Sequence, residues 1–141
     1  MRFWDASAIV PLLADEPQRG DVLAWLDADA ELLVWWGTPV EIASALARRE
    51  RDGTLAADAV GAALESLRGL EDAWHEIVPG DAVRRTAVRL LRTHSLGAAD
   101  SLQLAAALVA ADHDAQTLEF VCLDARLAAA ARREGFRVIG S

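Results

Sequence analysis

Apolar residues in this chain form short uninterrupted runs and longer repeats at helical spacing. The uninterrupted runs are too short to be helices and predict buried strands. These strands are residues 3–4, 32–36, 74–78, 119–123 (or 117–123) and 136–139. The repeats at helical spacing predict the helices between them. These are a helix that follows residue 5 and contains Pro11, then residues 17–28, 39–53, 54–67, 81–93, 98–111 and 124–134.

Strands separated by helices predict an α/β fold with a mostly parallel central sheet. Residues 39–53 and 54–67 have no strand between them and are expected to form a helical hairpin. The segment 98–111 is almost entirely apolar, so that helix is expected to be buried on most sides. The length of 141 residues, with no internal repeat or linker, predicts a single domain, residues 1–141.

Several helix starts carry capping residues. Thr38 and Pro39 are typical of a helix start, with a capping hydroxyl before a proline at the first helical position. Glu41 follows Thr38 by three residues, which is the spacing of a capping box. Thr54 is predicted to cap the next helix. Asp5 is predicted to end the first strand and begin the first helix, with Ser7 as a second capping candidate.

Four carboxylates share one predicted position, the N-terminal end of a helix: Asp5, Glu41, Asp100 and Asp124. Asp5 and Asp124 also follow strands directly, at the sheet edge where α/β folds bind ligands. Each acid alone can be explained as a cap or as an acid favoured by the helix dipole, and for Asp5 by itself the capping interpretation is the stronger one. For Glu41 by itself, the capping interpretation is the stronger one.

Convergence of the four acids would change that interpretation. Two like charges ~4 Å apart repel by about 4 kcal/mol at an effective dielectric near 20, so a shared site needs a cation. Hard divalent ions such as Mg²⁺ and Mn²⁺ prefer carboxylate oxygens. His75, His94 and His113 are scattered without zinc-ligand spacing and are predicted to be surface or capping residues. The acids therefore predict a Mg²⁺ or Mn²⁺ site.

The charged residues of the chain exclude several classes of protein. A net charge of −8 argues against nonspecific coating of nucleic acid, but not against a nuclease whose acids gather around a metal. All 14 basic residues are arginine. Without a lysine, the chain lacks the residue that aspartyl phosphotransferases such as haloacid-dehalogenase-like phosphatases and receiver domains use, and it has no P-loop.

The single cysteine, Cys122, lies in an apolar run and is expected to be a core residue in a reducing cytoplasm. No signal-peptide pattern and no apolar run of about 18 residues is found, so we expect a cytoplasmic protein without a membrane segment.

Four stretches together resemble the PIN-domain ribonucleases, specifically the VapC toxins of bacterial toxin–antitoxin pairs. They are FWDASAIVPLLADE, TPVEIASAL, LGAADSLQLAAAL and FVCLDARLAAAARREGFRVI, and they run nearly end to end. The resemblance implies a three-layer α/β/α domain and a Mg²⁺- or Mn²⁺-dependent endoribonuclease. It carries over Asp5 and Asp100 as the firmest metal ligands, Glu41 as a further ligand or orienting residue, and Asp124 as a ligand acting through water or a second metal.

Other residues have supporting roles in this resemblance. Ser7 matches the small hydroxyl residue near the first acid and would support the network by hydrogen bonding. Cys122 departs from the family, in which threonine is common at that position. Arg126 is the first candidate to hold an RNA phosphate, because it lies close to Asp124 in sequence, although a solvated salt bridge explains it equally well.

The resemblance also implies partners: a VapB-type antitoxin whose C-terminal segment covers the active site, an RNA substrate, and a second copy in a homodimer. Five tryptophans in so short a chain are consistent with such surfaces, although core packing explains Trp4, Trp35 and Trp36 at least as well. The alternative function is a PIN-fold module that binds RNA or protein without cutting RNA.

Overall fold

The computed structural model describes all residues, 1–141, and contains a five-stranded sheet in which every strand pairing is parallel. The strands are β1 (Arg2–Trp4), β2 (Leu32–Trp35), β3 (His75–Ile77), β4 (Glu119–Cys122) and β5 (Arg137–Gly140). Their order across the sheet is β3-β2-β1-β4-β5. The first strand therefore lies at the centre, and its carboxyl end is enclosed on both sides by neighbouring strands.

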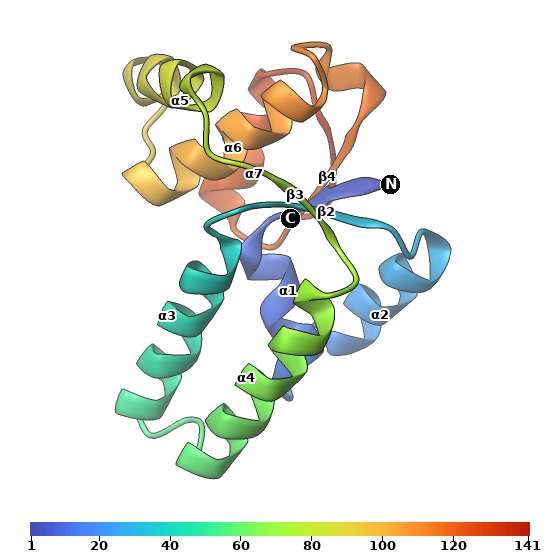
Figure 1. The fold of residues 1–141 in the computed structure, drawn as a ribbon, viewed down its shortest axis with the longest axis vertical. Coiled ribbons are helices and arrows are strands. Elements are labelled where there is room, and N and C mark those ends of the chain that lie inside the picture. The colour runs from blue at the N-terminus through green and yellow to red at the C-terminus, as the bar shows by residue number, and fades with distance from the viewer.

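Seven α-helices cover the sheet. They are α1 (Ala6–Leu13), α2 (Arg19–Ala28), α3 (Thr38–Arg51), α4 (Ala57–Glu71), α5 (Asp81–Thr93), α6 (Ala98–Ala110) and α7 (Ala125–Arg133), with a short 3₁₀ turn at Ala115–Thr117. Figure 1 shows the sheet between α5, α6 and α7 on one side and α1 to α4 on the other. The predicted three-layer α/β/α architecture is confirmed, and α3 and α4 form the predicted protruding hairpin (Figure 1).

The two faces of the sheet pack against separate apolar clusters. On one face Phe3 stacks on Phe120 with ring centroids 5.3 Å apart, next to the buried alanines of α6 and α7. On the other face Trp4 and Val34 pack against Ile42, among residues of α1 and α3. Alternation along β1 thus sends Phe3 and Trp4 to opposite layers, and the predicted burial of α6 is confirmed.

Three local predictions are wrong. Thr38 does not cap α3: the N-cap is Gly37, Thr38 is the first helical residue, and no side chain caps this helix. Thr54 does not cap α4, which begins at Ala57; its hydroxyl donates instead to the backbone oxygen of Arg49. The second helix begins at residue 19 rather than 17. The helix α3 thus begins one residue earlier than predicted, whereas α2 and α4 begin two and three residues later.

Side-chain burial settles two further points. Trp4, Trp35 and Trp74 are buried, whereas Trp36 is 55% exposed. Core packing therefore explains Trp4 and Trp35, as predicted, but not Trp36. Cys122 is fully buried, as predicted. None of the helices combines the length and apolar character that a membrane crossing requires.

Candidate active site

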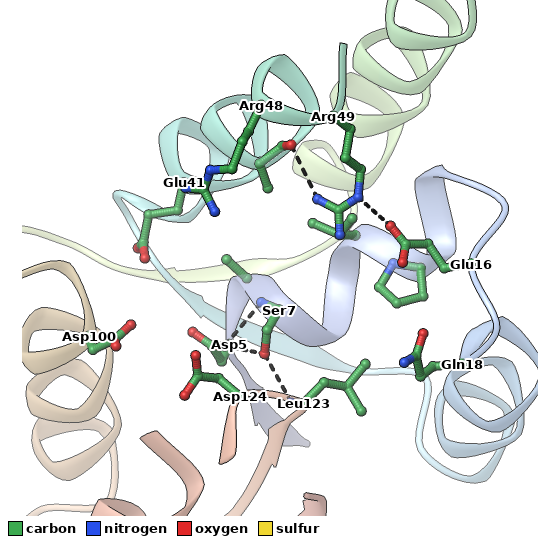
Figure 2. A pocket seen from close by; sticks show the side chains of 14 residues that line it. Asp5, Ser7, Glu16, Gln18, Glu41, Arg48, Arg49, Asp100, Leu123 and Asp124 are labelled. Carbon is green, nitrogen blue, oxygen red and sulfur yellow. Dashed lines mark hydrogen bonds and ion pairs between the residues drawn. The ribbon is translucent and has the colours of Figure 1, made fainter. Parts of the chain in front are cut away.

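All four predicted acids line one cavity of about 350 Å³ at the carboxyl edge of the sheet. Asp5 directly follows β1 and Asp124 lies just beyond β4, while Glu41 and Asp100 lie in the first turns of α3 and α6. Figure 2 shows the four side chains extending into the same space from these separate elements. The parallel sheet thus brings together residues that are up to 119 positions apart in sequence.

Asp5 is held in place by Ser7 and by the turn after β4. The carboxylate oxygen Oδ2 of Asp5 accepts hydrogen bonds from the Ser7 hydroxyl at 2.5 Å and the Ser7 backbone N–H at 3.0 Å, which makes Asp5 the N-cap of α1. The Ser7 hydroxyl oxygen in turn accepts a hydrogen bond from the backbone N–H of Leu123 at 2.9 Å. Ser7 therefore connects the turns that follow β1 and β4, and it orients Asp5.

Asp5 is buried and has no basic partner. Only 3% of the residue is exposed. Burial raises the pKa of Asp5 to about 6, against the effect of the hydrogen bonds from Ser7; the nearby negative charges of Asp100 and Asp124 raise it further. The Cys122 thiol lies 3.7 Å from Asp5 Oδ2, and burial followed by this negative charge raises the thiol pKa, so Cys122 remains a neutral thiol.

Glu41 is anchored by a residue that the sequence analysis did not identify. The side-chain amide of Gln103, in α6, donates hydrogen bonds to Glu41 Oε2 at 2.7 Å and to the Thr38 hydroxyl at 3.0 Å. Burial raises the pKa of Glu41 to about 8; the negative charge of Asp5 also raises it, the Gln103 hydrogen bond opposes the shift, and Asp100 adds to it. The capping-box role predicted for Glu41 is therefore wrong.

Asp100 and Asp124 lie at the more open side of the site. Asp124 is exposed and caps α7, accepting a hydrogen bond from the backbone N–H of Leu127 at its Oδ1 atom, 2.9 Å away. Asp100 is half-buried; burial and then the charge of Asp124 raise its pKa, while Arg126 lowers it. Asp124 therefore serves as a cap and also contributes negative charge to the cavity.

Arginines of the hairpin, rather than Arg126, line the cavity. Arg48 and Arg49 come from the last turns of α3. Arg49 is held by Glu16 at 2.5 Å, whereas Arg48 forms no ion pair. Arg126 lies outside this lining, in a separate small cavity beside His94 and Arg133. Of the basic residues, Arg48 is therefore the one placed to meet an anion in the cavity.

None of the three histidines lines this cavity. The prediction that all three are surface or capping residues is wrong for His94. That side chain is buried, and its Nε2 atom lies 2.6 Å from Glu134 Oε1.

The chemistry of the donor set fits a hard divalent cation. Three of the acids have raised pKa values, and the only basic influence among the causes is Arg126 on Asp100. No three of the acids are close enough together to surround an ion at once. Mg²⁺ commonly uses one or two carboxylates and retains several waters, so an open arrangement of this kind suits it.

The comparisons agree with this architecture. Residues 2–120 match the family model described as the PIN domain. A toxin–antitoxin complex from Klebsiella pneumoniae contains a similar fold, with 15% sequence identity, a TM-score of 0.67 and coverage of 99% of this chain and 96% of the other. FitAcB from Neisseria gonorrhoeae is also similar, with 18% identity, a TM-score of 0.71 and coverage of 99% and 97%.

No curated protein matches the chain. The family match nevertheless covers most of the sequence and includes Asp5, Glu41 and Asp100. The shared topology and the grouped acids are consistent with that match. This chain belongs to the PIN-domain family.

Proposed function

We propose that this protein is a Mg²⁺- or Mn²⁺-dependent endoribonuclease and acts as the toxin of a toxin–antitoxin pair. The observation that carries the proposal is the cavity in which Asp5, Glu41, Asp100 and Asp124 gather although none of them forms an ion pair with an arginine. A structural cluster of acids would be neutralised by arginine, as Glu134 is by Arg89 elsewhere in this chain. Uncompensated acids instead favour a site that is completed by a bound cation.

Each residue would have a distinct task. Asp5 and Asp100 would bind the cation most directly, with Glu41 and Asp124 as acceptors for its waters or as ligands of a second ion. A divalent ion held there would lower the pKa of a water and neutralise charge on the scissile phosphate. Ser7 fixes the orientation of Asp5 through the 2.5 Å hydrogen bond. Arg48 would hold a flanking phosphate, because its guanidinium lines the cavity without an acidic partner.

The toxin role is supported by the fold shared with the toxin–antitoxin complex from Klebsiella pneumoniae. We propose a VapB-type antitoxin as partner, with its C-terminal segment in the cavity. A short C-terminal segment bearing an arginine would fit a cavity lined by four acids. The homodimer and the cytoplasmic location stay predictions, which sedimentation analysis and cell fractionation would test.

The deciding experiment is cleavage of a mixed RNA substrate by purified protein, with EDTA, Mg²⁺ or Mn²⁺. We expect cation-dependent hydrolysis that leaves 5′-phosphate and 3′-hydroxyl ends. Asp100→Asn should abolish it. Asp112→Asn is the matched control, because it makes the same change at an exposed acid beyond the other end of α6.

Two results would contradict the proposal. Unchanged cleavage by Asp100→Asn would indicate a contaminating nuclease. Stable RNA binding without cleavage, by folded wild-type protein supplied with Mn²⁺, would favour the binding-module alternative.

A further inference from the structure

Gln103 is a polar side chain placed entirely inside the protein. It is fully buried on α6, next to the apolar residues Leu104 and Ala105. Burying an amide costs free energy unless its polar atoms are hydrogen-bonded. The nitrogen of this amide makes two hydrogen bonds, whereas its oxygen Oε1 has no partner. An apolar side chain would fill this position without leaving a buried acceptor unpaired.

The surroundings fix the orientation of the amide. Both neighbours of its nitrogen are oxygens, the Oε2 atom of Glu41 at 2.7 Å and the hydroxyl of Thr38 at 3.0 Å. A flipped amide would place its own oxygen 2.7 Å from a carboxylate oxygen, which is repulsive. The unpaired Oε1 is therefore the consequence of directing the NH₂ group at Glu41.

The contact also joins the two helices that carry acids. Gln103 lies three residues after Asp100, so both point from the same side of α6. Through Gln103 this side of α6 is tied to Glu41 in the first turn of α3. Oε2 of Glu41 is occupied by the amide, which leaves Oε1 free for a ligand. Figure 2 shows the Glu41 carboxylate extending from α3 toward the side of the cavity where Asp100 lies.

We propose that Gln103 is a positioning residue for Glu41: its buried amide holds one carboxylate oxygen so that the other faces a divalent cation bound between α3 and α6. The inference rests on the proposed function. Residues that hydrogen-bond to metal ligands orient those ligands, and their loss typically weakens metal binding or activity by 10- to 100-fold.

The test is a double-mutant cycle read out by Mn²⁺ binding in calorimetry, with RNA cleavage measured in parallel. Gln103→Leu keeps the side-chain volume and removes the donor. We expect Gln103→Leu to bind Mn²⁺ about 10- to 100-fold more weakly than wild type. In a Glu41→Ala background the same substitution should change Mn²⁺ affinity by less than about twofold, because the side chain that Gln103 positions is absent.

Leu104→Val is the control for general damage to α6, since Leu104 is the next residue and is equally buried. It should lower the melting temperature while leaving Mn²⁺ affinity unchanged. Equal Mn²⁺ binding by wild type and Gln103→Leu would overturn the inference alone. The same would follow if the loss persisted in full in the Glu41→Ala background, as expected for a merely structural role. Absence of Mn²⁺ binding and of cleavage in wild type would overturn the proposed function, and the inference with it.

Discussion

Two glutamates of this protein occupy contrasting environments. Glu134, at the end of α7, accepts hydrogen bonds from both terminal nitrogens of Arg89, at 3.3 and 3.1 Å, and lies 2.6 Å from His94. Burial alone would raise the pKa of Glu134, but the hydrogen bonds from Arg89 and His94 lower this pKa below its ordinary value. Glu41 has one neutral donor, Gln103, and burial together with Asp5 raises its pKa to about 8.

The contrast is between a carboxylate whose charge has basic partners within the chain and a carboxylate whose charge has none. The charge of Glu134 is compensated within the chain, so its contribution is to stability. The charge of Glu41 is opposed by the charges of Asp5 and Asp100, so the folded protein tolerates it at a cost. A cation bound beside Glu41 would remove that cost.

The largest expected difference comes from making one chemical change in both environments. Glu41→Gln should lower RNA cleavage by about a thousandfold, because an amide is a poor ligand for a hard cation. Glu134→Gln should leave cleavage within about twofold and lower the free energy of unfolding by about 2 kcal/mol, since a charged hydrogen-bond acceptor is lost. Single-turnover cleavage and urea unfolding of both variants would measure this. Comparable losses of cleavage would refute the distinction.

Cation binding should stabilise the folded protein, and this stabilisation should depend on the acids of the cavity and not on Glu134. At a Mn²⁺ concentration about 100 times the dissociation constant, the folded state gains about 2.7 kcal/mol. For a chain of this size, that corresponds to a rise in melting temperature of about 8 °C. Calorimetric scans with Mn²⁺ and with EDTA would show it. Asp100→Asn should lose most of the rise and Glu134→Gln should keep it; a rise of the same size in Asp100→Asn would place the cation elsewhere.

The pH dependence of stability without metal should differ between wild type and Glu41→Gln. The pKa of Glu41 rises from 4.5 in the unfolded chain to about 8 in the folded protein. The folded state therefore binds the proton more tightly, and this contribution to stability is complete below pH 4.5 and is lost as the pH rises through 8. We expect wild type to melt at least about 5 °C below Glu41→Gln at pH 8.5 and close to it at pH 4.5. A difference independent of pH would contradict the buried, uncompensated carboxylate.

The positions of the acids could be predicted from local sequence because caps and strand ends are local features. Asp5 and Asp124 follow apolar strands and accept hydrogen bonds from the next backbone turn, and the same positions direct them to the sheet edge. The parallel topology then follows from the alternation of strands and helices. Asp5 and Asp124 are therefore helix caps that also line the cavity, and their role as metal ligands stays a prediction.

The contacts that support the site depend on pairing across helices, which local sequence does not report. In the sequence Gln103 is one polar residue in an apolar helix, and only the hydrogen bond from α6 to α3 in the folded protein reveals Glu41 as its acceptor. Arg126 is predicted as the phosphate contact only because it lies close to Asp124 in sequence. The hairpin carries Arg48 over the cavity, although it is far from Asp124 in the chain. One available signal was the buried glutamine itself, since buried amides need partners.

The smallest expected effect is on RNA binding by the arginines. It compares the arginines that line the cavity with Arg126, which lies outside it. Arg48→Ala should weaken RNA binding to the inactive Asp100→Asn protein by about threefold to tenfold and should reduce the salt dependence of binding by about one charge. Arg49→Ala should weaken it less, because Glu16 already engages that guanidinium at 2.5 Å. Fluorescence anisotropy over a salt series would compare both variants with Arg126→Ala. A loss confined to Arg126→Ala would mean that RNA approaches across α7 rather than along the hairpin, and the phosphate contact would then belong to the small cavity beside His94.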